Sequence, residues 1–202
     1  MIAGLVLAAG GSSRMGSLKV LLPIDGRPMV RYAIDAARAA GLDEVVVVAG
    51  RDADRVGTAI LSFGLERVRT VVNEDWESGQ ASSLRAGIDA MAPGADAAVV
   101  MLADQPTIGT AAIVAVADAF LAGAGPVVQA SYAGRPAHPP LLARSVWPEL
   151  AGLSGDVGAR DAIATHPGWR VLVEIGGVVP ADVDTEADYE RMRLALEHST
   201  GD

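Results

Sequence analysis

The 202-residue sequence contains no cysteine, few aromatic residues and no long apolar run. Without cysteine the chain cannot form disulfides, iron–sulfur clusters or thiolate zinc sites. It has three histidines and no HExxH pattern, so a catalytic zinc site is not expected. No apolar run reaches the roughly 18 residues that a membrane span requires, and the first residues lack the basic region of a signal peptide. We therefore expect a soluble, cytoplasmic protein without a membrane partner.

Positive charge is also scarce, since 16 Lys and Arg residues face 25 Asp and Glu residues, a net charge of −9. A net acidic surface repels phosphate backbones and anionic lipids, so nucleic acid is not an expected partner. A small basic pocket for one nucleotide remains compatible with this charge. At roughly 150 residues per domain, the length predicts one domain over residues 1–202.

The apolar pattern alternates short strand-like runs with longer helical segments. Strands are expected over residues 2–8, 44–49, 69–73, 97–102 and 126–132, and helices over 28–40, 52–62, 80–91 and 109–122. Apolar strands that alternate with helices predict an α/β fold with a mainly parallel sheet and helices on both faces.

The last third of the chain breaks this alternation. Residues 134–140 contain three prolines and a histidine, and the prolines are expected to hold His138 in a fixed extended segment. A helical turn over 148–153, a helix over 158–165, a strand over 171–175 and a helix over 185–198 follow, with Thr185 and Asp188 spaced as a capping box. We expect these segments to lie over the carboxyl edge of the sheet, where open α/β folds bind ligands.

A polar, glycine-bearing loop follows the first strand. Small residues let backbone N–H groups approach a ligand closely, and hydroxyls and cations add donors and positive charge. In an acidic chain this combination suits a polyphosphate, and the alternative is a strand-to-helix turn with basic residues at the surface. The residues concerned are Gly10, Gly11, Ser12, Ser13, Arg14 and Lys19.

Two common phosphate-binding patterns are absent. The chain has no GxGxxG, which disfavours a nicotinamide-dependent oxidoreductase, and no GxxxxGK[ST], since Lys19 comes three residues after Gly16.

Two acidic positions lie where the expected sheet edge would place a metal. Asp104 follows the strand at 97–102, and Asp184 precedes the last helix. Mg²⁺ favours one or two carboxylates together with substrate phosphates, and both positions fit that preference. Asp104 has a second interpretation as a helix cap. Asp184 has neighbours that could replace it, namely Asp182, Glu186 and Asp188.

The segment 76–84 leads into the third expected helix and contains Gly79, Ser82 and Ser83. Hydroxyls at a helix start either cap the helix or bind an anion there, and both roles remain open. Trp76, Trp147 and Trp169 are expected to be packing residues.

The stretch LAAGGSSRMGSLKVLLPIDGRPMV resembles the signature of MobA/MocA-like nucleotidyltransferases, and more narrowly that of molybdenum cofactor cytidylyltransferases. The resemblance implies a single three-layer Rossmann-like domain. It also implies that the turn at Ala8, Ala9, Gly10 and Gly11 holds the base, whereas Ser12, Ser13, Arg14 and Lys19 hold the triphosphate. LADQP and DVDTEADYERM are similar to the metal motifs of the family, so Asp104 and Asp184 would hold one Mg²⁺.

Three further elements resemble parts of the same family. The segment with Gly79, Ser82 and Ser83 would contact the nucleotide. GRPAHP and SGDVGAR would line the acceptor pocket, with His138, Asp156 and Arg160 near the phosphorylated acceptor. Ala137 and Pro140 depart from the usual pattern there.

The activity that the resemblance implies is transfer of CMP from CTP to the terminal phosphate of molybdopterin, with release of pyrophosphate. Lys19 and Arg14 would neutralise the leaving pyrophosphate, and the product would serve a molybdoenzyme client. Ala9 favours a pyrimidine, because its methyl takes space from the base pocket where the guanylyl branch has glycine. The alternatives are guanylyl or other nucleotidyl transfer to a different phosphorylated metabolite or sugar, and a non-catalytic nucleotide or cofactor carrier.

Overall fold

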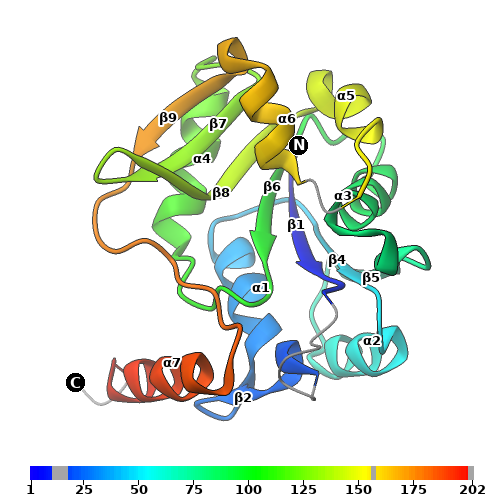
Figure 1. Cartoon of the computed structure of the whole chain (residues 1–202), viewed down its shortest axis with the longest axis vertical. Helices are drawn as coiled ribbons and strands as arrows, with labels where there is room; N and C mark the ends of the chain where they lie inside the picture. The colour runs from blue at the N-terminus through cyan, green and yellow to red at the C-terminus, as the bar shows by residue number, and fades with distance from the viewer. Residues whose placement is uncertain (11–17, 156–157, 200–202) are drawn as a thin grey trace.

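A seven-stranded, mainly parallel sheet forms the centre of the computed structural model, which describes residues 1–10, 18–155 and 158–199 (Figure 1). Its strand order is β5-β4-β1-β6-β8-β7-β9, and β8 is its antiparallel member. The strands are β1 (Ile2–Ala8), β4 (Val45–Ala49), β5 (Val68–Val72), β6 (Ala97–Leu102), β7 (Val127–Tyr132), β8 (Arg135–Ala143) and β9 (Arg170–Glu174).

Helices cover both faces of this sheet, which confirms the expected Rossmann-like α/β class. The helices are α1 (Met29–Ala39), α2 (Ala53–Ser62), α3 (Gln80–Asp89), α4 (Thr110–Leu121), α5 (Trp147–Ala151), α6 (Ala159–Thr165) and α7 (Glu186–Ser199). Apolar side chains of α1, α2 and α4 pack on one face, and those of α3, α5 and α6 pack on the other.

The central strands are apolar throughout because both of their faces are covered. Val45 and Val47 of β4 enter the core under α1, α2 and α4, whereas Val46 and Val48 enter the core under α3. The side chains of a strand alternate between faces, so one valine run supplies both cores. This explains why β1, β4 and β6 were identified almost to the residue from the apolar pattern.

The extended segment expected around His138 is part of β8, a strand of the sheet that the apolar pattern did not predict. The proline-rich part of β8 pairs with β7 across a register shift between Gln129 and Ser131. Only the proline-free end, Leu141 to Ala143, pairs with β6. Proline cannot donate a ladder hydrogen bond. It is tolerated in this part of β8 because β6 does not pair with it. Because of these prolines, the sequence pattern did not predict the strand that separates β6 from β7.

The last helix, α7, lies beside the short hairpin of β2 (Pro23–Ile24) and β3 (Arg27–Pro28) (Figure 1). Thr185 and Asp188 form the expected capping box, since the Asp188 carboxylate accepts from the Thr185 N–H at 2.8 Å and Thr185 Oγ1 accepts from the Asp188 N–H at 3.2 Å. No helix in the described part of the chain has the length and apolarity needed to cross a membrane.

Close packing of α3 on β1 depends on Gly87. A Cβ atom at this position would lie 2.3 Å from Leu5 Cδ1, and Leu5 is fully buried. We expect Gly87→Ala to lower the free energy of unfolding by about 1–3 kcal/mol through overpacking, despite the better helix propensity of alanine. Urea unfolding measures this loss.

The matched control is Gly57→Ala in α2, where no atom lies within 4 Å of the added Cβ. It should gain about 0.5–1 kcal/mol from helix propensity. Equal effects of the two substitutions would contradict the packing argument.

Candidate active site

Three chain segments meet at the carboxyl edge of the sheet, beyond the ends of β1 and β6. Lys19 begins a 3-10 turn, η1 (Lys19–Leu21), that follows β1 in the chain. Asp104 comes two residues after the end of β6, and Asp184 lies two residues before α7. This is the edge at which the carboxyl ends of parallel strands place ligand-binding residues.

The Lys19 ammonium group binds both carboxylates. It donates to Asp104 Oδ2 at 2.7 Å, to Asp184 Oδ1 at 3.0 Å and to the Val183 carbonyl at 3.1 Å. The Lys19 side chain is only 12% exposed, whereas that of Asp184 is half exposed. Burial opposes the charge of Lys19, but the two carboxylates outweigh it and raise the pKa of Lys19. The cation and both predicted metal ligands therefore form one cluster.

Each acidic residue around Asp184 has a different position and partner. The Asp182 carboxylate accepts from Gln105 Nε2 at 2.7 Å, and Asp188 belongs to the capping box of α7. Glu186 is the first residue of α7. Asp104 does not cap a helix, because α4 begins after Gly109. Of these residues, Asp104 and Asp184 are the two whose carboxylates bind Lys19.

Burial of Val183 holds the segment that carries Asp184 on the end of β6. Val183 is fully buried against Ile24 and Met29, and its N–H donates to the Asp104 carbonyl at 3.0 Å. The backbone contact aligns the two acidic residues, so their convergence does not depend on Lys19 alone.

The carboxylate pair fits a divalent cation by its donor chemistry. Two oxygens that reach one ammonium group at 2.7 and 3.0 Å face a common point. Mg²⁺ accepts one or two protein carboxylates and completes its shell with phosphate oxygens and water. The described residues contain no group of three or more His, Cys, Asp or Glu side chains placed to hold a metal. Asp104 and Asp184 would therefore hold a cation that also needs substrate oxygens.

Ser82 and Ser83 are buried and do not cap α3, whose N-cap is Gly79. Asn73 Nδ2 donates to Ser82 Oγ at 2.8 Å and to Ser83 Oγ at 3.0 Å. Gly79 has φ +108°, a backbone conformation that L side chains rarely adopt. The capping interpretation of the two serines is therefore wrong, and a buried amide fixes both hydroxyls at the start of the helix.

Gly155 and Gly158 lie close to the start of α3. Ala8 and Ala9 are buried, and Gly10 is exposed in open space. Ala81 N–H donates to the Gly155 carbonyl at 3.3 Å. A Cβ at Gly158 would lie 2.5 Å from Gln80 Oε1, so the loop before α6 approaches the start of α3 closely.

A cavity of about 690 Å³ lies between these elements, at the carboxyl ends of β1 and β6. His138 and Arg160, both predicted to bind the acceptor, line it together. Leu7, Val100 and Leu102 supply part of its apolar wall. Its volume lies within the roughly 300–1,000 Å³ of small-molecule sites.

Several predicted residues lie outside the described part of the chain. These residues are Gly11, Ser12, Ser13, Arg14 and Asp156. Their expected contacts with the triphosphate and the acceptor stay predictions.

Sequence reasoning missed several residues of this site. Asn73 and Gln105 follow strands at the carboxyl edge, and that position was a usable signal. Arg135 and Arg170 line the cavity from β8 and β9, and β8 was not predicted as a strand. The tryptophans do pack as expected, with Trp147 buried and Trp169 stacked on His166 at 3.9 Å between ring centroids.

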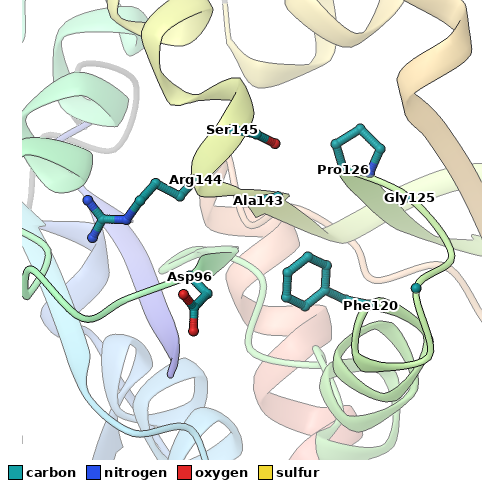
Figure 2. A pocket seen from close by; sticks show the side chains of 8 residues that line it. Asp96, Phe120, Gly125, Pro126, Ala143, Arg144 and Ser145 are labelled. Carbon is teal, nitrogen blue, oxygen red and sulfur yellow. The ribbon is translucent and has the colours of Figure 1, made fainter.

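A second hollow, of about 380 Å³, lies at the opposite, amino-terminal edge of the parallel strands. Figure 2 shows the Phe120 ring facing the space near Ala143 and Pro126, while the Arg144 side chain extends away from it. The Arg144 guanidinium donates to the carbonyls of Ala92, Pro93 and Ala95. The Arg144 side chain therefore stabilises the loop before β6. None of the predicted site residues lines this hollow.

Burial lowers the pKa of His138 below its ordinary value, against the opposing effects of the Val100 carbonyl, Asp182 and Asp104. The unfolded chain then binds a proton at this histidine more readily than the folded chain does. Stability should therefore fall as the pH drops below about 6.5. We expect His138→Asn to lose less stability between pH 7 and pH 5 than the unsubstituted protein, measured by urea unfolding. An identical loss in both proteins would contradict this expectation.

Comparison with known proteins identifies the family of this chain. Residues 4–170 match the MobA-like NTP transferase domain family. Nicotine blue oxidoreductase of Paenarthrobacter nicotinovorans is 34% identical, over 95% of this chain and 96% of its own length. The purine catabolism protein PucB of Bacillus subtilis is 30% identical, over 96% of both chains.

Two solved structures are similar to this chain over nearly its full length. The crystal structure of Rv0371c from Mycobacterium tuberculosis has a TM-score of 0.85 and 36% identity, covering 96% of this chain and 97% of its own. Rv0371c has also been crystallised in complex with manganese, and that structure matches with a TM-score of 0.81, 33% identity and coverage of 96% and 98%. The chain therefore belongs to the MobA-like NTP transferase family and is a nucleotidyltransferase.

Proposed function

We propose that this protein transfers CMP from CTP to the terminal phosphate of molybdopterin and releases pyrophosphate, with Mg²⁺ as its cation. The observation that carries the proposal is the convergence of Lys19, Asp104 and Asp184 at the carboxyl edge of the sheet. A site with a cation and two adjacent carboxylates suits phosphate chemistry between two anionic substrates.

The reaction needs positioning and charge neutralisation more than it needs a nucleophilic side chain. An oxygen of the acceptor phosphate attacks the α-phosphorus of CTP, the bond from that phosphorus to the bridging oxygen breaks, and pyrophosphate leaves. The acceptor phosphate is already ionised at neutral pH, so no general base is required. A divalent cation held by Asp104 and Asp184 would neutralise charge on the phosphate oxygens of the substrates.

The chain's own residues have distinct parts in this scheme. Asp104 and Asp184 would hold the cation. Lys19 would move its charge from the carboxylates to the phosphates and, with Arg14, neutralise the leaving pyrophosphate. Ser82 and Ser83, fixed by Asn73, would contact the nucleotide at the start of α3.

Ala9 supports the proposed preference for CTP. It is 4% exposed, and its Cβ would lie 3.0 Å from a Cβ added at Gly50, so it packs tightly at the end of β1. A methyl at this turn takes volume from the base pocket and favours a pyrimidine. One methyl gives about 1–3 kcal/mol of discrimination. Guanylyl transfer is therefore the alternative within this chemistry.

The acceptor assignment uses the cavity of about 690 Å³. His138 and Arg160 line it, as do two further cations, Arg135 and Arg170. This lining suits a phosphorylated, partly apolar molecule. In the cell, the product would be passed to a molybdoenzyme client.

A second candidate function is an oxidoreductase, which is favoured only by the name of the relative from Paenarthrobacter nicotinovorans. The missing GxGxxG spacing argues against a nicotinamide dinucleotide site in the usual arrangement. Oxidation of NADH or NADPH, followed at 340 nm, would detect such an activity directly.

The first experiment measures pyrophosphate release with Mg²⁺ and each of CTP, GTP, ATP and UTP, with and without molybdopterin. Release should require CTP and molybdopterin together. Asp104→Asn should lower the rate at least about 100-fold, because it removes a charge that holds the cation. Asp118→Asn, an exposed charge on α4, is the matched control and should keep the wild-type rate.

Other outcomes decide between the alternatives. Release with GTP would keep the chemistry and overturn the base assignment. Tight CTP binding without any release, unaffected by Asp104→Asn, would favour a carrier.

A second prediction concerns the cation site. Lys19→Met leaves the Asp104 and Asp184 carboxylates without their counter-ion, so the free energy of unfolding in EDTA should fall by about 1–2 kcal/mol. Mn²⁺ should raise the free energy of unfolding of this variant more than that of the wild type. In the variant, Mn²⁺ does not compete with the ammonium group for the two carboxylates. Urea unfolding with EDTA or Mn²⁺ measures both effects.

Arg191→Met is the control, since Arg191 is 72% exposed in its pair with Asp188. It should change stability by less than about 0.5 kcal/mol, with no dependence on Mn²⁺. Equal responses of the two variants to Mn²⁺ would argue against the carboxylate pair as the cation site.

A further inference from the structure

Gln105 presents a buried carboxamide to the cavity that holds His138. Gln105 is 6% exposed and lines this cavity directly after Asp104. Its Nε2 donates to Asp182 Oδ1 at 2.7 Å. A carboxylate only accepts hydrogen bonds, so the amide nitrogen must face Asp182 and the oxygen must face the other way. The orientation of the amide is thereby fixed.

The other end of this amide has no partner. Gln105 Oε1 is the one buried side-chain oxygen or nitrogen, within the described residues, that makes no hydrogen bond. A buried acceptor that stays unpaired is costly, and native proteins keep few of them. An oxygen in this state on a cavity wall favours a ligand that brings a hydrogen-bond donor.

The surroundings of Gln105 indicate what kind of ligand this is. Asp182 lines the same cavity but already accepts from the amide nitrogen, so Oε1 is the unpaired acceptor of this pair. Apolar side chains of Leu7, Val100 and Leu102 lie along the same cavity, which suits a flat ring. Positive charge comes from three arginines on the lining, which suit an anionic group on the same molecule. They are Arg135, Arg160 and Arg170.

We propose that Gln105 Oε1 recognises the exocyclic amino group on the aminopyrimidinone edge of the pterin acceptor. This amino group is a hydrogen-bond donor, and it matches the one unpaired acceptor on this part of the cavity wall. The inference rests on the proposed function, since it names the part of the acceptor that this cavity wall would bind. Gln105 is then a specificity-determining residue for the acceptor, whereas its neighbour Asp104 serves the cation.

The test compares two small fluorescent ligands that differ at positions 1 and 2 of the pteridine ring. 6-Hydroxymethylpterin has the amino group at C2, and 6-hydroxymethyllumazine has a carbonyl oxygen there and a proton on N1. Fluorescence titration of the wild-type protein should give about tenfold tighter binding of the pterin, the effect of one hydrogen bond to a buried acceptor. This comparison needs no variant and so does not depend on a substitution that folds.

Gln105→Leu should abolish the preference for the pterin. Gln129→Leu is the matched control, because Gln129 lines the same cavity at 8% exposure and its amide nitrogen already donates to the Ala137 carbonyl. It should keep the preference. Equal binding of both ligands to the wild type, or an unchanged preference in Gln105→Leu, would overturn the proposal.

A transfer assay separates this proposal from the proposed function. With [α-³²P]CTP and molybdopterin, Gln105→Leu should raise the KM for molybdopterin about tenfold and leave the KM for CTP unchanged. If the wild type transfers label and Gln105→Leu keeps the wild-type KM for molybdopterin, the inference fails and the function stands. If the wild type neither binds the pterin nor transfers label to molybdopterin, both fail.

Discussion

The ammonium group of Lys19 binds two carboxylates that lie 85 and 165 residues away in the chain. Through these contacts the segment after β1, the end of β6 and the start of α7 are held together. The two carboxylates repel each other, and the Lys19 ammonium group between them offsets that repulsion. In the nucleotidyl transfer that we propose, Asp104 and Asp184 would hold a divalent cation, and Lys19 would neutralise charge on the phosphates.

The fold delivers these groups to one edge because β1 and β6 are parallel neighbours. Their carboxyl ends point the same way, and Lys19 and Asp104 both follow those ends. Asp184 reaches the same edge differently. Buried Val183 and its hydrogen bond to the Asp104 carbonyl hold its segment across the end of β6. The sheet therefore sets the positions of Lys19 and Asp104, whereas the packing of Val183 sets the position of Asp184.

The apolar pattern was sufficient for β1, β4 and β6, because strands buried on both faces are continuous valine-rich and alanine-rich runs. It failed for β8, where prolines suppressed the strand signal although only one neighbouring strand pairs with that segment. The motifs identified Lys19, Asp104 and Asp184, which the structure brings together. They did not reveal Gln105, since its contact with Asp182 spans 77 residues and a single glutamine carries no periodic signal.

We propose that Asp104 and Asp184 exchange Lys19 for a divalent cation when nucleotide binds. A crystal structure with Mn²⁺ and a CTP analogue whose α–β bridging oxygen is replaced by carbon would show this exchange. We expect an anomalous peak for manganese within about 2.5 Å of both carboxylates, with the Lys19 ammonium group moved to the phosphates. A peak elsewhere, or a lysine still bound to both carboxylates beside an occupied nucleotide site, would contradict it.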